Sequence, residues 1–587
     1  MLQFLKFVFA TITGLFLFLF LCVVLLIGLA SSISSSDKQA EIETNSVLKL
    51  ELSRNITEQT AEKDPFTEIF NQNAPSQIGL LQIKEAIANA KLDPKIKGIY
   101  LSAEDPQAAW ATLEEIRESL LDFKTSKKFI YSYAEGQSEK GYYLASLSDK
   151  IYINPAGGME LNGIVANYTF FKGLFDKLDI QPEIFRVGRF KSAVEPFFLT
   201  KMSDENKMQN KEFLTSISKH YLSKIATSRG IPETELEKIV NELKTETPEQ
   251  ALENKIITNI GYWDQFEDAL KSALKTTDKI KMVGITNYLK GEKMIKVNTS
   301  ANKIAVIIAQ GDIVTGDGNE GEIGSDTYIK EIAKARKDKK VKAIVLRINS
   351  GGGSAAASDM MFREIELAKK EKPVIASMGD YAASGGYYMA MGADSIVAQP
   401  TTITGSIGVF GVLFNIEKFF GNKLGITFDH VSTHEYADFP SATRTMSDAE
   451  KAKMQNSTNQ IYEKFTSLAA KNRKMDVNKL REIAGGRVWS GMDAKRIGLV
   501  DVLGNYEDAI KIAAKKAKLK EGDYKIKYSP SKKSPLDKYF KKLNEDAEEK
   551  AIAAMLGNDL APFAKSLKKI KAMEGIQMRM PNIMDVK

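Results

Sequence analysis

The sequence contains a long internal repeat, and this repeat constrains the fold more than any other feature. The segment DPKIKGIYL at residues 93–101 returns as DKKVKAIVL at residues 338–346, a shift of 245 residues. The same shift aligns the two GYY tripeptides that begin at Gly141 and Gly386. Similarity held at one long spacing is typical of a duplicated structural unit. We therefore expect two tandem domains of related fold.

Each copy alternates short runs of β-branched residues with longer segments compatible with helices. In the second copy these are residues 343–348, 355–370 and 374–378. Strands that alternate with helical segments predict βαβ units around a mostly parallel sheet, which is an α/β fold. Strands of such a fold end at turns where ligands bind, so the glycine-rich turns of the second copy are candidate site residues.

Composition excludes several classes of protein. The chain has 587 residues, of which 43% are hydrophobic and 27% charged, as in folded globular proteins with more than one core. The net charge of +7 is too small to indicate nucleic-acid binding, which we do not expect. The single cysteine, Cys22, lies in the apolar N-terminal run, so the rest of the chain has no disulfide, zinc site or thiol nucleophile.

The N-terminal segment predicts a membrane anchor. Residues 7–30 carry no charge, and a helix of that length would be about 36 Å long, enough to cross a bilayer. A cleavable signal peptide is the alternative, although the apolar run exceeds the usual length of such a segment. Lys6 precedes the run and Asp37 follows it, so we expect the large C-terminal part on the outer side of the membrane.

The repeat and the N-terminal apolar run divide the chain into predicted segments. We expect an anchor at residues 1–36, the first repeat at 37–290, the second at 300–528 and a basic tail at 529–587. The tail contains an amphipathic run at residues 536–567, which predicts a packing helix or a contact with a membrane surface.

Ser384 is the candidate nucleophile. It lies in GDYAASGGYY, between small residues where a strand should turn into a helix, and the earlier NSGGGS begins at Asn349. A serine in such a turn and nearby backbone N–H groups are what acyl transfer requires. We expect Gly385, Gly352 and Gly353 to form the oxyanion hole.

The first copy lacks these features. Glu139 stands where the second copy has Ser384, and Lys140 stands where it has Gly385. The flanking GYY is kept, so the fold alone does not demand the serine and the glycines.

A serine nucleophile needs a base, and the chain has three histidines. His220 lies in a helix-like run and is interpreted as a packing or surface residue. His430 and His434 follow the second motif, so a Ser/His/Asp triad through one of them is the alternative mechanism.

Four motifs together resemble the long (67K) form of the signal peptide peptidase A family. They are NSGGGS, GDYAASGGYY, TGSIGVFG at residues 404–411 and VGRFKSAVEPF at residues 187–197, and the ending GIQMRMP at residues 575–581 agrees with them. The resemblance covers nearly the whole chain. Gly351 replaces a proline that is frequent in related proteins.

The resemblance implies a fold, a mechanism and a setting. Each repeat would have the fold shared by ClpP and the crotonases, with Ser384 as nucleophile and Lys191 as general base. The substrates would be cleaved signal peptides, hydrolysed without a metal or cofactor. The protein would be a homotetramer held in the bacterial inner membrane by its N-terminal helix, with its catalytic part on the periplasmic side.

The residues around Lys191 agree with a role as base. An ordinary lysine is protonated at neutral pH, and burial among apolar side chains lowers its pKa. Phe190 and Phe197 supply such surroundings. We expect Glu195 to point away from the amine, because a close carboxylate would raise the pKa, and Ser406 to orient the amine.

Two functions of other classes stay open at this point. A crotonase-like acyl-CoA enzyme would share the fold and have no use for Lys191. A non-catalytic membrane scaffold built on a peptidase fold would not need Ser384.

Overall fold

The structure is a computed structural model that describes residues 2–34, 42–59, 77–291, 299–530, 575–580 and 584–586. The predicted run at 536–567 lies outside these residues, as do residues 292–298 between the two predicted repeats. The expected mixed α/β fold is confirmed.

The first half of the chain builds a six-stranded sheet in which every neighbouring pair is parallel. Its strands, in spatial order, are β10 (Met282–Gly284), β1 (Ser46–Glu51), β4 (Ile96–Ser102), β5 (Phe129–Gln137), β6 (Lys150–Met159) and β9 (Asn259–Ile260). The helices of this half are α3 (Leu80–Leu92), α4 (Trp110–Lys124), α5 (Glu139–Ala145), α6 (Lys172–Leu178), α7 (Glu195–Phe198), α8 (Asp204–Arg229), α9 (Glu233–Asn241), α10 (Pro248–Glu253), α11 (Trp263–Leu274) and α12 (Ile285–Lys290), with the short 3₁₀ helix η1 (Ser192–Val194).

The second half builds an eight-stranded sheet, parallel except where β18 meets β20. Its strands are β11 (Lys303–Gln310), β14 (Val341–Ser350), β16 (Val374–Ala383), β17 (Ser395–Ala398), β18 (Ile403–Gly405), β20 (Val488–Ser490), β21 (Val502–Leu503) and β22 (Lys525–Ser529). Its helices are α13 (Ser325–Lys337), α14 (Ala355–Glu371), α15 (Gly385–Ala390), α16 (Glu417–Phe419), η2 (Phe420–Leu424), α17 (Asp448–Arg473), α18 (Val477–Ile483), α19 (Gly491–Arg496) and α20 (Tyr506–Lys516).

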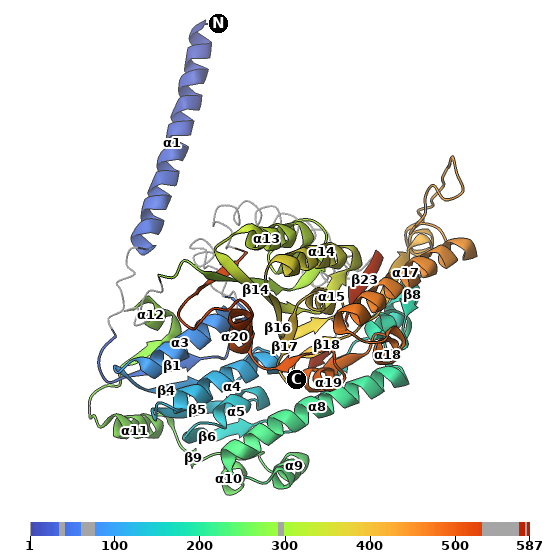
Figure 1. Ribbon diagram of the computed structural model, residues 1–587. Helices are drawn as coiled ribbons and strands as arrows, with labels where there is room; N and C mark the ends of the chain where they lie inside the picture. Colours follow the sequence, from blue (N-terminus) through green and yellow to red (C-terminus); the bar gives the residue numbers. More distant parts are fainter. Residues whose placement is uncertain are drawn as a thin grey trace.

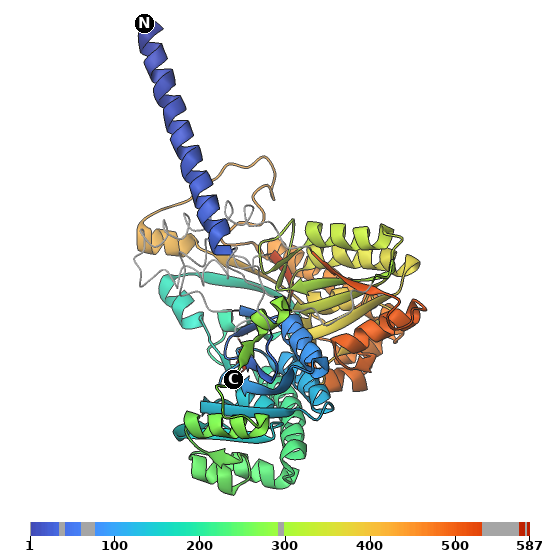
Figure 2. The same ribbon diagram turned by 90° about the vertical axis from the view of Figure 1, so that its left-hand side faces the viewer.

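The two sheets have matching strand orders, which is the structural counterpart of the sequence repeat. The order β10-β1-β4-β5-β6-β9 of the first corresponds to β22-β11-β14-β16-β17-β21 in the second. Strand β14 is buried over nearly its whole length, because α13 and α14 cover one face of the sheet and α20 covers the other. Figures 1 and 2 show the blue and green first half beside the yellow and orange second half.

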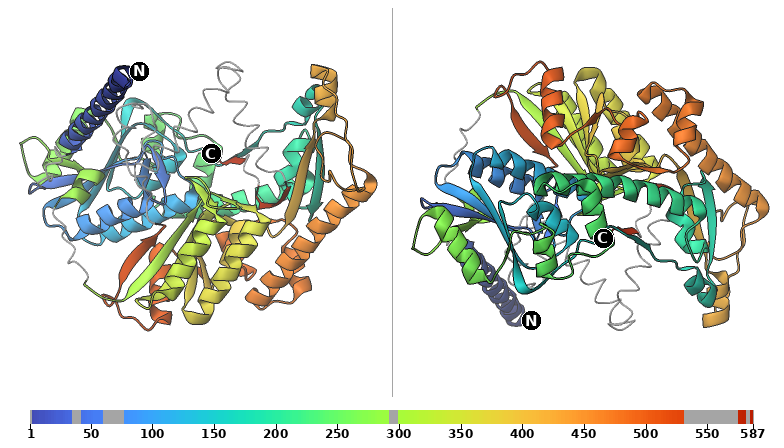
Figure 3. Two further views of the ribbon diagram at one scale, coloured as in Figure 1. Left: turned by 90° about the horizontal axis from the view of Figure 1, so that it is seen from above. Right: turned by 90° about the horizontal axis from the view of Figure 1, so that it is seen from below.

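A third sheet joins the halves and positions the site. Its order is β13 (Glu322–Gly324), β12 (Asp312–Val314), β15 (Gly352–Ser354), β23 (Gly575–Arg579), β19 (Val409–Asn415) and β8 (Gln181–Val187). Strand β8 comes from the first half and pairs antiparallel with β19 of the second, from Val187 opposite Val409 to Gln181 opposite Asn415. The teal and tan strands at one end of the molecule in Figure 3 are this pair. Two small sheets, β2 (Asn55–Thr57) with β3 (Gln77–Gly79) and β7 (Ala166–Tyr168) with β24 (Met584–Val586), complete the strands.

Helix α1 (Leu2–Ser34) stands apart from the rest of the molecule (Figures 1 and 2). Within the described residues, no helix combines the length and the apolar character needed to cross a bilayer. The expected membrane anchor therefore stays a prediction.

Candidate active site

The lysine and the serine singled out from the sequence are in contact. The Lys191 amine donates a hydrogen bond to Ser384 Oγ at 2.8 Å. It also donates to the carbonyl oxygen of Ser406 at 3.2 Å and to Ser406 Oγ at 3.1 Å. All three side chains are buried. The structure thus brings together residues that lie 193 positions apart in the sequence, and it places the Ser406 hydroxyl within hydrogen-bond distance of the amine.

The backbone holds Ser384 in an unusual conformation. The residue follows β16 and precedes α15, with φ 54° and ψ −111°. Its N–H donates to the carbonyl of Gly405 at 2.8 Å, and its hydroxyl donates to the carbonyl of Gly408 at 3.4 Å. Non-glycine residues in such regions of φ/ψ space cluster at functional sites, because the surrounding structure must impose the strain. A sharp turn between strand and helix also aims the serine hydroxyl out of the sheet.

Lys191 is positioned by the pairing of β8 with β19 and by glycines that sequence reasoning missed. A Cβ on Gly486 would lie 2.6 Å from the backbone nitrogen of Lys191, and one on Gly408 would lie 3.1 Å from its Cδ. The Phe190 N–H also donates to the carbonyl of Gly485 at 3.0 Å. The consecutive glycines at 485 and 486 were a signal that could have been noticed, because paired glycines often mark a close approach of two backbones.

Burial lowers the pKa of Lys191 well below its ordinary value, and in the part of the chain that the structure describes no carboxylate opposes this effect. Glu195 points away, as expected. It accepts hydrogen bonds from the Ser203 hydroxyl at 2.6 Å and from the Asn206 amide at 3.0 Å. A neutral amine at hydrogen-bond distance from a hydroxyl can accept the hydroxyl proton, so this arrangement can activate Ser384.

The three glycines expected in an oxyanion hole lie close together but are not equivalent. A Cβ on Gly385 would be 3.2 Å from the Cα of Gly352. The N–H of Gly352 donates to Ser350 Oγ at 3.1 Å, so this group is already engaged. Gly385, the first residue of α15, is therefore a better candidate than Gly352 for binding an oxyanion, because the first N–H groups of a helix have no partner within it.

The histidines lie elsewhere. His430 and His434 are exposed in the segment after η2, and His434 contacts the hydroxyl of Thr433. His220 contacts Glu114 at 3.1 Å and is partly buried in α8. Among the described residues, the hydrogen bonds of the Ser384 hydroxyl join it to Lys191 and Gly408. The geometry therefore favours Lys191, rather than a histidine of a Ser/His/Asp triad, as the general base for Ser384.

In the first half, the position equivalent to Ser384 has a structural role. Glu139 is buried and accepts hydrogen bonds from the Tyr221 hydroxyl and, at 3.2 Å, from the Gly163 N–H. Burial raises the pKa of this carboxyl. Its contacts explain why the first copy can keep the fold without a serine there.

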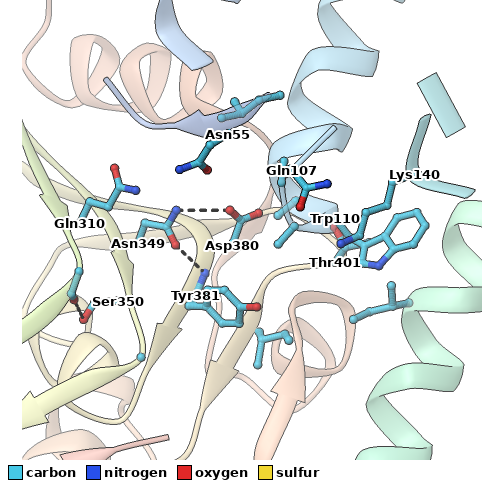
Figure 4. Close-up of a pocket in the computed structure, with 18 of the residues that line it drawn as sticks. Asn55, Gln107, Trp110, Lys140, Gln310, Asn349, Ser350, Asp380, Tyr381 and Thr401 are labelled. Atoms are coloured by element: carbon cyan, nitrogen blue, oxygen red, sulfur yellow. Dashed lines mark hydrogen bonds between the residues drawn. The ribbon is translucent and has the colours of Figure 1, made fainter. Parts of the chain in front are cut away.

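A polar cavity of about 520 Å³ lies between the two halves. Figure 4 shows Asn349 at its wall, where its amide donates to Asp380 at 3.4 Å and its oxygen accepts from the Tyr381 N–H at 3.2 Å. The residues lining this cavity include Ser350 and Lys140 but neither Lys191 nor Ser384. The cavity therefore adjoins the strands that carry the site without containing the buried lysine and serine.

Comparison with known proteins identifies relatives across most of the chain. The family model described as peptidase family S49 matches residues 122–277 and again residues 366–520, once in each half. A solved structure of a ClpP1 mutant from Listeria monocytogenes is 15% identical, with 35% of this chain and 94% of that chain covered and a TM-score of 0.24, too low to support an argument about the fold.

Three curated relatives match over much longer stretches. Protease 4 of Salmonella typhi is 36% identical over 83% of this chain and 80% of its own length. Protease 4 of Haemophilus influenzae is 34% identical over 83% and 82%, respectively. The chloroplastic serine protease SPPA of Arabidopsis thaliana is 33% identical over 92% and 78%. With such coverage, the acyl-CoA enzyme and the non-catalytic scaffold are set aside: the chain belongs to peptidase family S49 and is a serine peptidase.

Proposed function

We propose that this serine peptidase uses a Ser/Lys dyad, with Ser384 as nucleophile and Lys191 as general base. The observation that carries the proposal is the 2.8 Å contact between a fully buried amine and the serine hydroxyl. Burial lowers the pKa of Lys191, so the amine is available in its neutral form.

The chemistry proceeds through an acyl-enzyme. Lys191 takes the hydroxyl proton as Ser384 Oγ attacks the peptide carbonyl, and the same proton then passes to the leaving amine. Backbone N–H groups of Gly385 and Gly353 stabilise the oxyanion. Water, deprotonated by Lys191, releases the acyl group. Ser406 keeps the amine oriented through its two contacts.

The proposed substrates are signal peptides left in a membrane after cleavage, and the proposed location follows from them. The sequence supports an N-terminal membrane anchor, because no charge interrupts residues 7–30, and Phe4, Phe7 and Phe16 in this segment are 70–76% exposed. The anchor would hold a homotetramer on the bacterial inner membrane, with the catalytic part on the periplasmic side. On that side of the membrane, the active site would lie close to the cleaved signal peptides that are its proposed substrates.

Hydrolysis of an unstructured apolar peptide by purified variants tests the dyad. We expect Ser384→Ala and Lys191→Met each to lower kcat/KM on the order of 10³-fold or more, because each removes one half of a cooperating pair. Lys372→Met is the control, since Lys372 also has a pKa lowered by burial but donates to the carbonyls of Ala335 and Asp338. Activity that survives in Ser384→Ala, or that falls equally in the control, would contradict the proposal.

A further inference from the structure

The first half has a counterpart of the catalytic turns, and the polar cavity between the halves lies against it. At the spacing of the sequence repeat, Lys140 corresponds to Gly385 and Trp110 to Ala355, and helices α4 and α14 begin at Trp110 and Ala355. Lys140 and Trp110 both line the cavity. The first half thus has two large side chains with polar groups where the second half has an alanine and a glycine around its candidate active site.

Two polar groups in the wall of this cavity are deeply buried. Trp110 is 4% exposed and Thr401 is 3% exposed, and both line the cavity. Among the residues that the structure describes, neither the indole Nε1 of Trp110 nor the hydroxyl of Thr401 has a hydrogen-bond partner. Buried polar groups are nearly always hydrogen-bonded. Two such groups in one cavity therefore indicate that their partner comes from outside the chain.

The indole of Trp110 is held in place by aromatic contacts. Its ring stacks on Tyr221, with centroids 4.5 Å apart and planes at 19°, and it meets Tyr143 edge-on at 5.7 Å. Because the ring is already packed, its N–H is oriented before a ligand arrives, and binding orders little that was free.

The groups at one end of the cavity match a carboxylate. Figure 4 shows Lys140, Trp110 and Thr401 at this end. The indole N–H only donates, a threonine hydroxyl can donate, and the lysine ammonium donates and carries a positive charge. Hydrogen bonds from such donors to an ionised oxygen are stronger than neutral ones. Lys140 comes from the first half and Thr401 from the second, so the site needs both halves.

The rest of the cavity suits the amide groups of a peptide. Asn349 and Gln310 lie at the other end, with Asp380 between the two ends (Figure 4). The Asp380 carboxylate accepts hydrogen bonds from the Thr112 N–H at 2.8 Å, the Thr112 hydroxyl at 2.7 Å and the Asn349 amide at 3.4 Å. A carboxylate has room for one more donor, such as a peptide N–H. The volume of about 520 Å³ is that of a site for a small ligand.

We propose that this cavity is a second peptide-binding site, in which Lys140, Trp110 and Thr401 hold the C-terminal carboxylate of a peptide. The ligand class is short peptides with a free C-terminus, a group that substrates and products of a peptidase both carry. Ser350 lines the cavity and accepts a hydrogen bond from the Gly352 N–H, so the bound peptide would lie beside the glycine-rich turn of the candidate active site. The inference goes beyond the proposed dyad and does not depend on it.

Calorimetric titration of the full chain with N-acetyl-dialanine and with its C-terminal amide tests the proposal. Ser384→Ala is the background, so that the peptide is not consumed. We expect the free acid to bind about tenfold more tightly than the amide or better, because only the acid brings a charged acceptor. Equal affinities, or no binding of either at millimolar concentration, would overturn the proposal and leave the cavity to water. Cut peptide detected by mass spectrometry would instead contradict the dyad.

Two neighbouring threonines give a matched pair of variants. Thr401→Val removes a hydroxyl that bonds to no described residue, so the unfolding midpoint should hold or rise while the affinity for the acid falls about tenfold. The Thr402 hydroxyl donates to the carbonyl of Gly379 at 2.9 Å and accepts from the Gln399 N–H at 3.1 Å. Thr402→Val should therefore lower the midpoint and leave the affinity unchanged. The reverse pattern would overturn the proposal.

Turnover by the chain with Ser384 intact distinguishes the two sources of the carboxylate. If it belongs to the substrate, amidation of a peptide substrate should raise its KM about tenfold in the parent chain but not in Thr401→Val. If it belongs to a product, acid and amide should be cut equally, and added N-acetyl-dialanine should inhibit the parent chain more than the variant. Turnover that responds to neither change in a Thr401-dependent way would overturn the recognition of peptide ends.

Discussion

At the scale of single residues, two buried lysines show what determines whether an amine can act as a base. Lys84 is buried, yet its pKa is raised, because Glu115 and Glu507 each lie 2.5 Å from its amine. Lys191 is buried beside hydroxyl and carbonyl oxygens, and its pKa is lowered. The groups that contact the amine, more than its burial, decide whether the pKa of a buried lysine is raised, as in Lys84, or lowered, as in Lys191.

Gly486→Ala tests how closely Lys191 depends on its surroundings. The new Cβ would lie 2.6 Å from the Lys191 backbone nitrogen, so we expect displacement of the amine and loss of most peptide hydrolysis. Gly522→Ala is a matched control: its φ of +86° is close to the +83° of Gly486, and nothing lies within 4 Å of its Cβ. Both variants bear the same backbone strain, so only the first should be inactive; equal activity in the two would show that this close approach is unimportant.

Sequence reasoning identified Ser384, Lys191 and Ser406, because motifs and apolar neighbours are local features. It did not find Gly408 and Gly486, since nothing local tells which glycine will pack against a lysine hundreds of residues away. It also could not show that the N–H of Gly352 bonds to Ser350.

At the scale of elements, the two central sheets were predictable and the third was not. Alternating β-branched and helical segments predict parallel strands, and β14 and β16 lie where those segments do. The pairing of β8 with β19, and the insertion of β23 beside β15, join strands that are distant in the sequence. Such pairings depend on how the halves dock, which periodicity does not encode.

At the scale of elements, the testable prediction is that helix α1 anchors the protein in a membrane. If it anchors the protein, the full chain should sediment with membranes and resist extraction by high salt and alkaline carbonate, whereas a chain that lacks residues 1–36 should be recovered in the soluble fraction. Cell fractionation followed by blotting measures this. Release of the full chain by carbonate would contradict the anchor.

At the scale of the whole molecule, a buried ionic network joins the two halves. Arg347 of the second half forms ion pairs with Glu58 at 2.9 Å and Glu115 at 2.8 Å, both from the first half. All three side chains are at most 1% exposed. Because the proposed dyad takes Lys191 from one half and Ser384 from the other, contacts that dock the halves would also assemble the site.

Arg347→Met should therefore destabilise the protein strongly. Removing one member of a buried ion pair leaves uncompensated charges and costs about 3–5 kcal/mol, here with Glu58 and Glu115 both losing their cation. Arg336→Met is the control, because Arg336 also pairs with two glutamates, Glu364 and Glu371, but is 18% exposed, and Glu371 is 48% exposed, so that solvent weakens these pairs. Denaturant unfolding of both variants measures the difference, and similar unfolding midpoints would contradict the assigned role of the network.

The central claim is that Lys191 activates Ser384, and the pH dependence of Ser384 acylation by a fluorophosphonate tests it most directly. Because the pKa of Lys191 is lowered, its neutral form predominates above that pKa, so the labelling rate should rise with pH and level off well below 10.5. Mass spectrometry should locate the adduct on Ser384, and Lys191→Met should lose both the fast rate and this pH dependence. Labelling of Lys191→Met at the wild-type rate with the same pH profile would contradict the account.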